Sequence, residues 1–360
     1  MDKVVLDVSG SVPFKPDEEC EVWTPAHRLK CTNGGVCERP DLNTLKFFLV
    51  GDTGGLPIYP YTTYGQNKVA KALSQMGEEK SSEFQISLGD NIYYTGVKNI
   101  FDQRFESSFE DVYLGDAMQK PWYMIGGNHD HFGNITAQVA YTTFPSLYYK
   151  ISYKFSEKGI SVDFIMTDTI VLCGNTRDVE DAGFFDMIFA DVSADPDNPK
   201  DPKAAQTQWK WIERQLNEST ADYLFVAGHY PVLSISEHGP MKCLVEKLNP
   251  LLKKYRVSAY FAGHDHTLQD VFIDNETEPL MMHYIISGAA SRSDRSKKHE
   301  GDVPPGSSFY PTGFNPLSQL GFSNGGFVFV EISDQSAIFK FFTGKSEQKY
   351  NCSILPRKFH

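Results

Sequence analysis

The chain has 360 residues, 41% of them hydrophobic and 13% aromatic, which is enough for a large packed core in one or two domains. With 46 acidic against 34 basic residues, its formal net charge of −12 argues against a nucleic-acid partner or an anionic membrane surface. A small phosphate ester is still admissible as a substrate, because a bound multivalent cation inverts the local field.

Residues 1–44 carry Pro, Gly and three cysteines without hydrophobic periodicity, which predicts a cysteine-bearing N-terminal extension, either appended or pinned by disulfides. Residues 1–16 lack the apolar core of a signal peptide, so the chain is either a mature or trimmed form or it is not secreted. No run in the chain approaches the roughly 18 apolar residues of a membrane span.

Cysteines and glycosylation sequons favour an oxidising compartment. The cysteines are even in number: Cys20, Cys31, Cys37, Cys173, Cys243 and Cys352. Acceptor sequons stand at Asn134, Asn217, Asn275 and Asn351. A sequon taken alone is about as often an unmodified surface loop as a glycosylated one. The sequons therefore support an oxidising compartment only together with the cysteines.

Short apolar runs along the chain predict buried strands, and a polar residue able to bind a metal follows each of them. The runs are Phe47–Val50, Phe84–Leu88, Trp122–Ile125, Tyr223–Val226 and Ala259–Phe261. The motifs that follow are Gly51-Asp52, Gly89-Asp90 with Tyr93, Gly127-Asn128-His129-Asp130-His131, Gly228-His229, and Gly263-His264-Asp265-His266. A Gly at a strand end allows a sharp turn, so the next side chain points into the crevice there.

Helical stretches separate the strands. Apolar residues share a helical face in three places: Val69, Leu73 and Met76; Trp209, Ile212 and Leu216; and Leu244, Leu248, Leu251 and Leu252. Further strands are expected at Ile160–Thr167, Met282–Ser287, Gly326–Ile332 and Ile338–Phe342. These elements predict an α/β fold in which two packed mixed β-sheets are flanked by helices.

The predicted ligands run from Asp52 to His266, so they belong to one folding unit if they meet in space. We therefore expect a catalytic domain over residues 45–345, followed by a C-terminal tail over 346–360. Within the domain, Asp178–Lys203 has an acidic start, an apolar middle and a Pro-rich end. Its length without clear structure predicts an exposed loop over a functional face.

The mixture of donors predicts a pair of first-row metal ions. Carboxylate, phenolate and amide oxygens suit hard cations, whereas imidazole suits Fe, Zn and Mn. The candidate ligands are Asp52, Asp90, Tyr93, Asn128, His229, His264 and His266. Asp90 can bridge two ions with its two oxygens, and a dinuclear centre favours phosphoester hydrolysis.

Each motif alone has a structural interpretation. Gly51-Asp52 is more often a turn or helix cap, Tyr93 beside Tyr94 is usually packing, and His229 could be a buried, hydrogen-bonded imidazole. The joint occurrence of five polar strand ends favours the metal site.

The ordered motifs resemble those of the purple acid phosphatase branch of the metallophosphoesterases. The strings Gly89–Gly96, Gly228–Val232, Glu237–Pro240 and Gly263–His266 are similar to the small tartrate-resistant acid phosphatases, over about residues 45–345. The resemblance implies the calcineurin-like fold and an acid phosphatase that cleaves phosphate monoesters by attack of a metal-bound hydroxide.

The resemblance also implies roles for single residues. A ferric ion would be held by Asp52, Tyr93 and His266, with Asp90 shared. The second ion, ferrous iron, zinc or manganese, would be held by Asn128, His229 and His264. Tyrosinate-to-iron charge transfer would colour the protein. His129 and His238, which match histidines beside the metal ligands in the family, would bind phosphate and protonate the leaving group.

Further implications concern the surroundings of the enzyme. The resemblance pairs Cys173 with Cys243 and makes Asn134 a glycosylated position. It implies a monomeric, secreted or lysosomal enzyme that acts on small phosphate monoesters or phosphoproteins, with no nucleic-acid partner and no membrane insertion.

Some features depart from the family or leave alternatives open. Thr53 stands where the family commonly has Trp, and the pairing of Cys20, Cys31, Cys37 and Cys352 is undetermined. The apolar middle of Asp178–Lys203 could cover the metals or pack on the surface, and we favour packing. Two other functions remain: a metal-dependent phosphodiesterase or nucleotidase, and a redox-active iron protein or inactive binding protein without a hydrolytic role.

Overall fold

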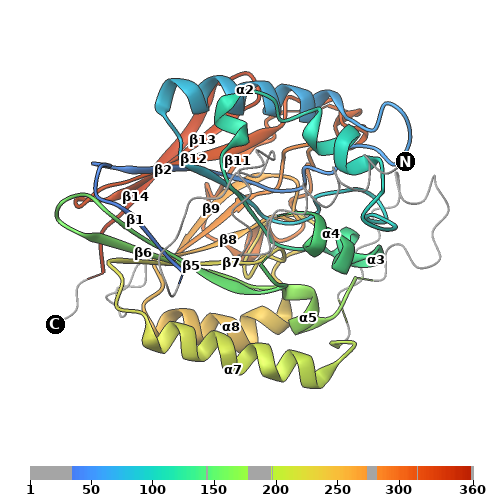
Figure 1. Cartoon of the computed structure of the whole chain (residues 1–360). Coiled ribbons are helices and arrows are strands. Elements are labelled where there is room, and N and C mark those ends of the chain that lie inside the picture. The colour runs from blue at the N-terminus through green and yellow to red at the C-terminus, as the bar shows by residue number, and fades with distance from the viewer. Residues whose placement is uncertain are drawn as a thin grey trace.

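The computed structural model describes residues 35–142, 145–176, 196, 198–273, 282–313 and 315–357. Two β-sheets pack face to face between outer helices (Figure 1). In spatial order the first sheet contains β1 (Val36–Arg39), β5 (Tyr149–Phe155), β6 (Ile160–Met166), β7 (Tyr223–Ala227), β8 (Ala259–Ala262), β10 (Met282–Ser287), β9 (Leu268–Ile273) and β11 (Ser308–Tyr310). The second contains β14 (Gln348–Ile354), β13 (Ala337–Thr343), β12 (Gly326–Ile332), β2 (Leu45–Val50), β3 (Phe84–Ser87) and β4 (Trp122–Met124).

Both sheets are mixed, which confirms the predicted fold class. In the second sheet β2, β3 and β4 are parallel, while β12, β13 and β14 are antiparallel to their neighbours. In the first sheet β6, β7, β8 and β10 form a parallel block, and β9 runs antiparallel beside β10.

Three long helices cover the outer faces of the sandwich. Helix α2 (Tyr64–Lys80) lies over the second sheet, and α7 (Pro202–Glu218) and α8 (Lys242–Lys254) lie under the first (Figure 1). Thr63 and Gln66 form a capping box that starts α2. The apolar faces predicted from the sequence are buried at Val69, Leu73, Ile212, Leu216, Leu244 and Leu248. Among the described helices, none is both long and apolar enough to cross a membrane.

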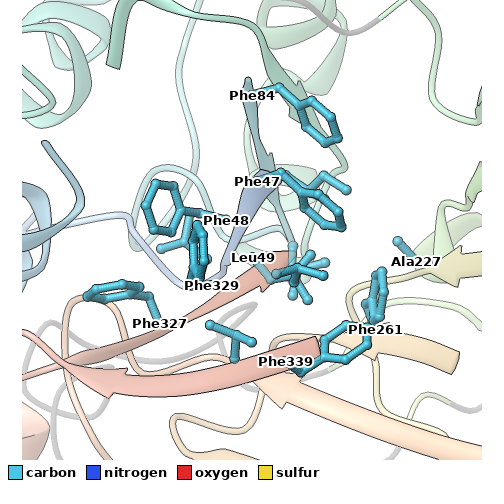
Figure 2. Packing of buried hydrophobic residues seen from close by; sticks show 14 of the residues in the cluster. Phe47, Phe48, Leu49, Phe84, Ala227, Phe261, Phe327, Phe329 and Phe339 are labelled. Atoms are coloured by element: carbon cyan, nitrogen blue, oxygen red, sulfur yellow. The ribbon is translucent and has the colours of Figure 1, made fainter. Parts of the chain in front are cut away.

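Alternating side chains of β2 fill two separate layers of the core. Phe47 stacks on Phe84 at 4.7 Å between the sheets, whereas Phe48 faces the other way and meets Phe329 at 5.4 Å (Figure 2). Successive residues of a strand point to opposite faces of its sheet, so both faces of β2 must be apolar. The continuous run Phe47–Val50 therefore reads as a strand buried on both sides.

Short helices follow strand ends on the site side of the sandwich. They are α3 (Asn128–Phe132), α4 (Ile135–Tyr141) and α5 (Thr169–Cys173), and single turns lie at Glu106–Glu110, Asp116–Gln119, Glu300–Asp302 and Ser318–Leu320. The disulfide expected from the resemblance is present. It joins Cys173, at the end of α5, to Cys243, at the start of α8, with a Cα–Cα distance of 5.8 Å.

The sheets extend past the predicted limits of the catalytic domain. Strand β1 lies within the predicted N-terminal extension and pairs with β5, while β14 lies within the predicted tail and pairs with β13. The predicted loop Asp178–Lys203 ends too late, because Asp201 caps α7 and Pro202 is its first residue. Residues 177–195 and 197, and with them the apolar middle of that loop, lie outside the described residues.

Candidate metal centre

The carboxyl ends of five parallel strands meet at one edge of the sandwich. Strands β2, β3 and β4 of the second sheet and β7 and β8 of the first all end there. All seven predicted ligands lie in the segments that follow these strands, and six of them are buried: Asp52, Asp90, Tyr93, Asn128, His229 and His264. The expected convergence of strand ends is therefore present in the structure.

Three of these side chains form a group that we call the tyrosine group: Asp52, Tyr93 and His266. The Tyr93 hydroxyl lies 3.0 Å from Asp52 Oδ1 and 2.9 Å from His266 Nε2, and His266 Nε2 lies 3.4 Å from Asp52 Oδ1. Donors that share one first-row ion at roughly 2.0–2.2 Å lie about 3 Å from one another. The spacing of the group therefore suits a common ion.

A second set, Asn128, His229 and His264, lies beside the first, and we call it the histidine group. His229 Nε2 lies 2.9 Å from Asn128 Oδ1 and 3.4 Å from Asp90 Oδ1. Ligand atoms of Asp90, His229 and His264 all lie within 4.8 Å of one another.

Hydrogen bonds outside the centre orient the histidine group. His229 Nδ1 donates to the Leu88 carbonyl at 2.8 Å, which leaves the Nε2 lone pair directed at the centre. The Asn128 amide donates to Thr176 Oγ1 at 3.0 Å, so its carbonyl oxygen points inward. His264 Nε2 is buried without a hydrogen-bond partner in the described part of the chain. A metal ion would satisfy this nitrogen.

Asp90 lies between the two groups, and the backbone fixes its position. Its Oδ1 accepts the His129 backbone N–H at 3.0 Å. Gly127 passes so close that a Cβ there would lie 2.1 Å from Asp90 Oδ1. Asp52 and Asp90 both have positive φ angles, of 59° and 51°, which turn their side chains into the centre. The glycines at the strand ends thus permit the close approach that the sequence pattern predicted.

The electrostatics of the centre call for a cation. Burial, then Asp52 and Asp90, raises the pKa of Tyr93 well above its ordinary value. Burial also raises the pKa of Asp52, and it lowers the pKa of His264 well below its usual range, with His238 adding to the effect. The protein alone therefore disfavours charge on these groups, and a multivalent ion would reverse that preference.

Asp90 and His229 behave as a pair. Burial acts to raise the pKa of Asp90, but His229 and His129 outweigh it and the pKa is lowered. For His229, burial acts to lower the pKa, Asp90 outweighs it, and the pKa rises to about 9. Without a metal, a proton on His229 neutralises Asp90; a metal ion would displace that proton.

The donor chemistry, the spacing and the orphaned His264 nitrogen together fit two metal ions. The tyrosine group offers a phenol, a carboxylate and an imidazole, which suits a hard trivalent ion. The histidine group offers an amide oxygen and two imidazoles, which suits a divalent first-row ion. Asp90 can contribute to both.

Two further histidines border the centre. His129 Nδ1 lies 2.6 Å from the Tyr94 carbonyl, and its Nε2 lies 3.9 Å from Asp90 Oδ2. The ring of His238 lies 4.2 Å from the ring of His264, and its backbone N–H donates to Asp265 Oδ1. Both predicted proton donors are thus beside the predicted ligands.

Sequence reasoning assigned no role to Asp130, which is buried at the base of the centre. It accepts hydrogen bonds from the backbone N–H groups of Asn91, Ile92 and Gly127 and from Gln138 Nε2, at 2.8–3.2 Å. Asp130 thereby ties the loop that carries Asp90 and Tyr93 to the loop that carries Asn128. Asp130 stands in the polar run after β4, but that run alone does not distinguish a metal ligand from a residue that holds the ligand loops in place.

The sequence motifs also gave no role to Arg292. Its guanidinium is buried over the rings of Tyr93 and Tyr94, 4.3 and 4.7 Å from their centroids, and it donates to Tyr94 Oη and to the Gly55 carbonyl. It lies in the loop after β10, outside every motif, so no spacing in the sequence points to it.

Comparison with known proteins agrees with the geometry. The sequence model of the family described as calcineurin-like phosphoesterase matches residues 45–268. The chain is 40% identical to human tartrate-resistant acid phosphatase type 5 over 87% of its own length and 91% of that protein. It is 31% identical to purple acid phosphatase 4 of Arabidopsis thaliana, over 94% and 89% of the two chains.

The chain belongs to the calcineurin-like phosphoesterases, in their purple acid phosphatase branch. Solved structures share its fold at lower identity. A purple acid phosphatase from yellow lupin seeds superposes with a TM-score of 0.57 and 13% identity, over 87% of this chain and 54% of that one. GAP50, the anchor in the inner membrane complex of Plasmodium, superposes with a TM-score of 0.66 and 23% identity, over 88% and 90%.

Proposed function

We propose that this chain is an acid phosphatase that hydrolyses phosphate monoesters with two metal ions. The tyrosine group would hold a ferric ion, the histidine group a ferrous, zinc or manganese ion, and Asp90 would contribute to both. The observation that carries this proposal is the convergence of the two groups on one buried carboxylate, from five strand ends and two sheets. The identity to tartrate-resistant and purple acid phosphatases supports it.

When bound, the ions would lower the pKa of a water molecule and stabilise charge on the phosphoryl oxygens. The chain supplies the other components. Asp130 and the strand-end glycines hold the ligand loops in place, and the buried setting of Asp52 and Tyr93 excludes bulk water from one side of the centre.

Proton transfer to the leaving group is assigned to His129 or His238. His129 fixes its Nδ1 on the Tyr94 carbonyl, so that Nε2 is the nitrogen free to exchange a proton with a substrate. Burial lowers the pKa of His129, which matches a donor that works in acid and gives up its proton readily. His238 borders the histidine group, where it can contact a phosphate oxygen.

The surroundings of the enzyme are also part of the proposal. The Cys173–Cys243 disulfide supports an oxidising compartment, and we infer a secreted or lysosomal glycoprotein. We further infer a monomer acting on small phosphate monoesters or phosphoproteins, glycosylated at Asn134, which is exposed at the start of α4.

A direct test compares a phosphate monoester with a phosphate diester under identical conditions, at pH values from acidic to neutral. We expect hydrolysis of the monoester, with a much lower rate on the diester. His264→Ala should lose the divalent ion and keep the ferric ion, because His264 belongs to the histidine group. A preference for the diester would favour the phosphodiesterase alternative.

A further inference from the structure

A second cluster of metal-binding side chains lies outside the metal centre. Ligand atoms of Asp270, His283 and Cys352 all lie within 4.8 Å of one another. His283 is the second residue of β10, and Gly288, beside Asp52, follows the other end of that strand. At about 3.3 Å per residue the cluster lies roughly 16 Å from the centre along β10.

Strand register explains why residues so far apart in the sequence meet. His283 pairs with Phe272 across the antiparallel β9–β10 ladder, and Asp270 lies two residues from Phe272, on the same face of β9. Leu268, two residues further along that face, belongs to the core between the sheets. Asp270 and His283 therefore face the second sheet.

The third residue comes from the second sheet. Cys352 lies in the edge strand β14, between exposed Asn351 and Ser353. Because successive side chains of a strand point to opposite faces, the Cys352 side chain points inward, as that of Ile354 does. Strand β14 contacts β11 at the border of the sandwich. The cluster thus draws one ligand from each of three strands in two different sheets.

The buried carboxylate of Asp270 brings the cluster together: besides His283, the Cys352 thiol and the Tyr350 hydroxyl hydrogen-bond to it. The Asp270 side chain is fully buried, and within the described residues its one ion-pair partner is His283, whose Nδ1 lies 2.9 and 3.1 Å from its two oxygens. Cys352 is a free, half-buried thiol. Burial raises the pKa of this thiol, and the negative charge of Asp270 adds to the effect.

We propose that Asp270, His283 and Cys352 form a third metal site, one that binds zinc and joins the two sheets. A thiolate, an imidazole and a carboxylate are the three donor types that Zn²⁺ takes in proteins, and a fourth position is left for water. Binding would release the Cys352 proton to solvent, and the ion would replace the thiol–carboxylate hydrogen bond with two metal–ligand bonds. The site is independent of the phosphatase centre, which neither supplies nor needs these residues.

The test measures the reactivity of the Cys352 thiol, because a measurement of total bound zinc would also include zinc in the metal centre. The full chain with its centre loaded is treated with iodoacetamide, with and without added Zn²⁺, and alkylation of Cys352 is measured by peptide mass spectrometry. Zinc at about ten times its dissociation constant leaves roughly one site in ten empty, so we expect about tenfold slower alkylation. An unchanged rate at saturating zinc, or a Cys352 that is oxidised in the purified chain, overturns the proposal.

A second readout identifies the ligands. Added Co²⁺ should give a thiolate-to-cobalt charge-transfer band in the near ultraviolet in the wild type and in the control Gln348→Ala, which changes an exposed residue of the same strand. The band should be absent in Cys352→Ser, and zinc protection of the thiol should be lost in His283→Gln. The same cobalt band in Cys352→Ser would contradict the assignment. The wild-type measurements stand even if a ligand variant does not fold.

Discussion

The guanidinium of Arg292 lies over the ring of Tyr93, with Cζ 4.3 Å from the ring centroid. A buried cation in this position stabilises a phenolate and attracts an electron to a neighbouring metal ion. At an effective dielectric constant of about 20, a unit charge some 4–6 Å away contributes on the order of 3–4 kcal/mol.

We therefore expect Arg292→Met to lower the reduction potential of the iron and to move the visible band to longer wavelength. The reason is that the phenolate loses more stabilisation than the metal ion, which lies further from Arg292. Arg292→Lys keeps the charge and should remain near the wild type. Redox titration followed by absorbance measures both quantities, and equal behaviour of the Met and Lys variants would refute an electrostatic role.

Tyr93→Phe should abolish the visible band and leave a folded protein. The hydroxyl is the atom that meets Asp52 and His266, while the ring packs against His129 and Tyr94 and would be retained in the variant. Absorbance and circular dichroism on the same sample check the two halves of the prediction. A band that survives the substitution would remove Tyr93 from the ligand set.

His129→Ala should reduce turnover most for substrates with poor leaving groups, by roughly a hundredfold or more. Such leaving groups need a proton in the transition state, whereas an acidic phenol leaves as its anion. The measurement is kcat across a series of aryl and alkyl phosphates. Equal losses along the whole series would argue that the His129 imidazole binds phosphate or packs against Tyr93 and does not protonate the leaving group.

Gly127→Ala should impair metal binding and lower activity by at least about a hundredfold. The new Cβ would lie 2.1 Å from Asp90 Oδ1 and 2.3 Å from Asp90 N, so the carboxylate must move. Gly301→Ala is the matched control, because a Cβ there meets nothing within 4 Å. If both variants bind two ions with unchanged activity, close packing of Gly127 against Asp90 does not matter to the centre.

The buried pair of His131 and Asp168 predicts a pH-dependent contribution to stability. His131 Nε2 lies 2.8 Å from Asp168 Oδ2; burial acts to lower the pKa of His131, but Asp168 outweighs it and the pKa is raised. A histidine whose pKa is raised in the folded state stabilises that state. The contribution is complete at pH values below the unfolded-state pKa of about 6.5, and it is lost as the pH rises through the folded-state pKa.

His131→Gln should therefore cost roughly 1–3 kcal/mol of unfolding free energy at pH 5.5, taken as about one unit below that unfolded pKa, and less at high pH. His299→Gln is the control, since His299 pairs with the exposed Asp302 at the surface. Urea unfolding of the metal-loaded proteins across this pH range gives the comparison. A loss of unfolding free energy in His131→Gln that grows as the pH rises would contradict this prediction.

The sequence predicted the elements in which a local pattern and a tertiary role agree. Runs such as Phe47–Val50 are apolar on both faces because both faces are buried, and glycines precede the ligands because a Cβ there would lie within 3 Å of neighbouring atoms. Helices α2, α7 and α8 were readable because one face of each packs on a sheet.

In other parts of the chain the local sequence pattern does not indicate the tertiary role. Strand β14 has the sequence QKYNCSI, and its outward residues are polar because it is an edge strand, so it was mistaken for a tail. The loop boundary at Lys203 was misplaced because Pro202 looked like loop composition, although Pro is favoured in the first turn of a helix. Arg292 meets Tyr93, and Asp168 meets His131, through contacts made only in three dimensions, and no spacing in the sequence points to either contact.

The most direct test of the two-metal centre is removal and restoration of its ions. The purified protein is assayed for iron, zinc and manganese, for visible absorbance and for phosphate monoester hydrolysis, before and after reductive chelation. We expect two ions at the centre, at least one of them iron, and loss of the band and of activity together, with both restored by iron and a divalent ion. A chain that is free of all three metals and still fully active would contradict the account.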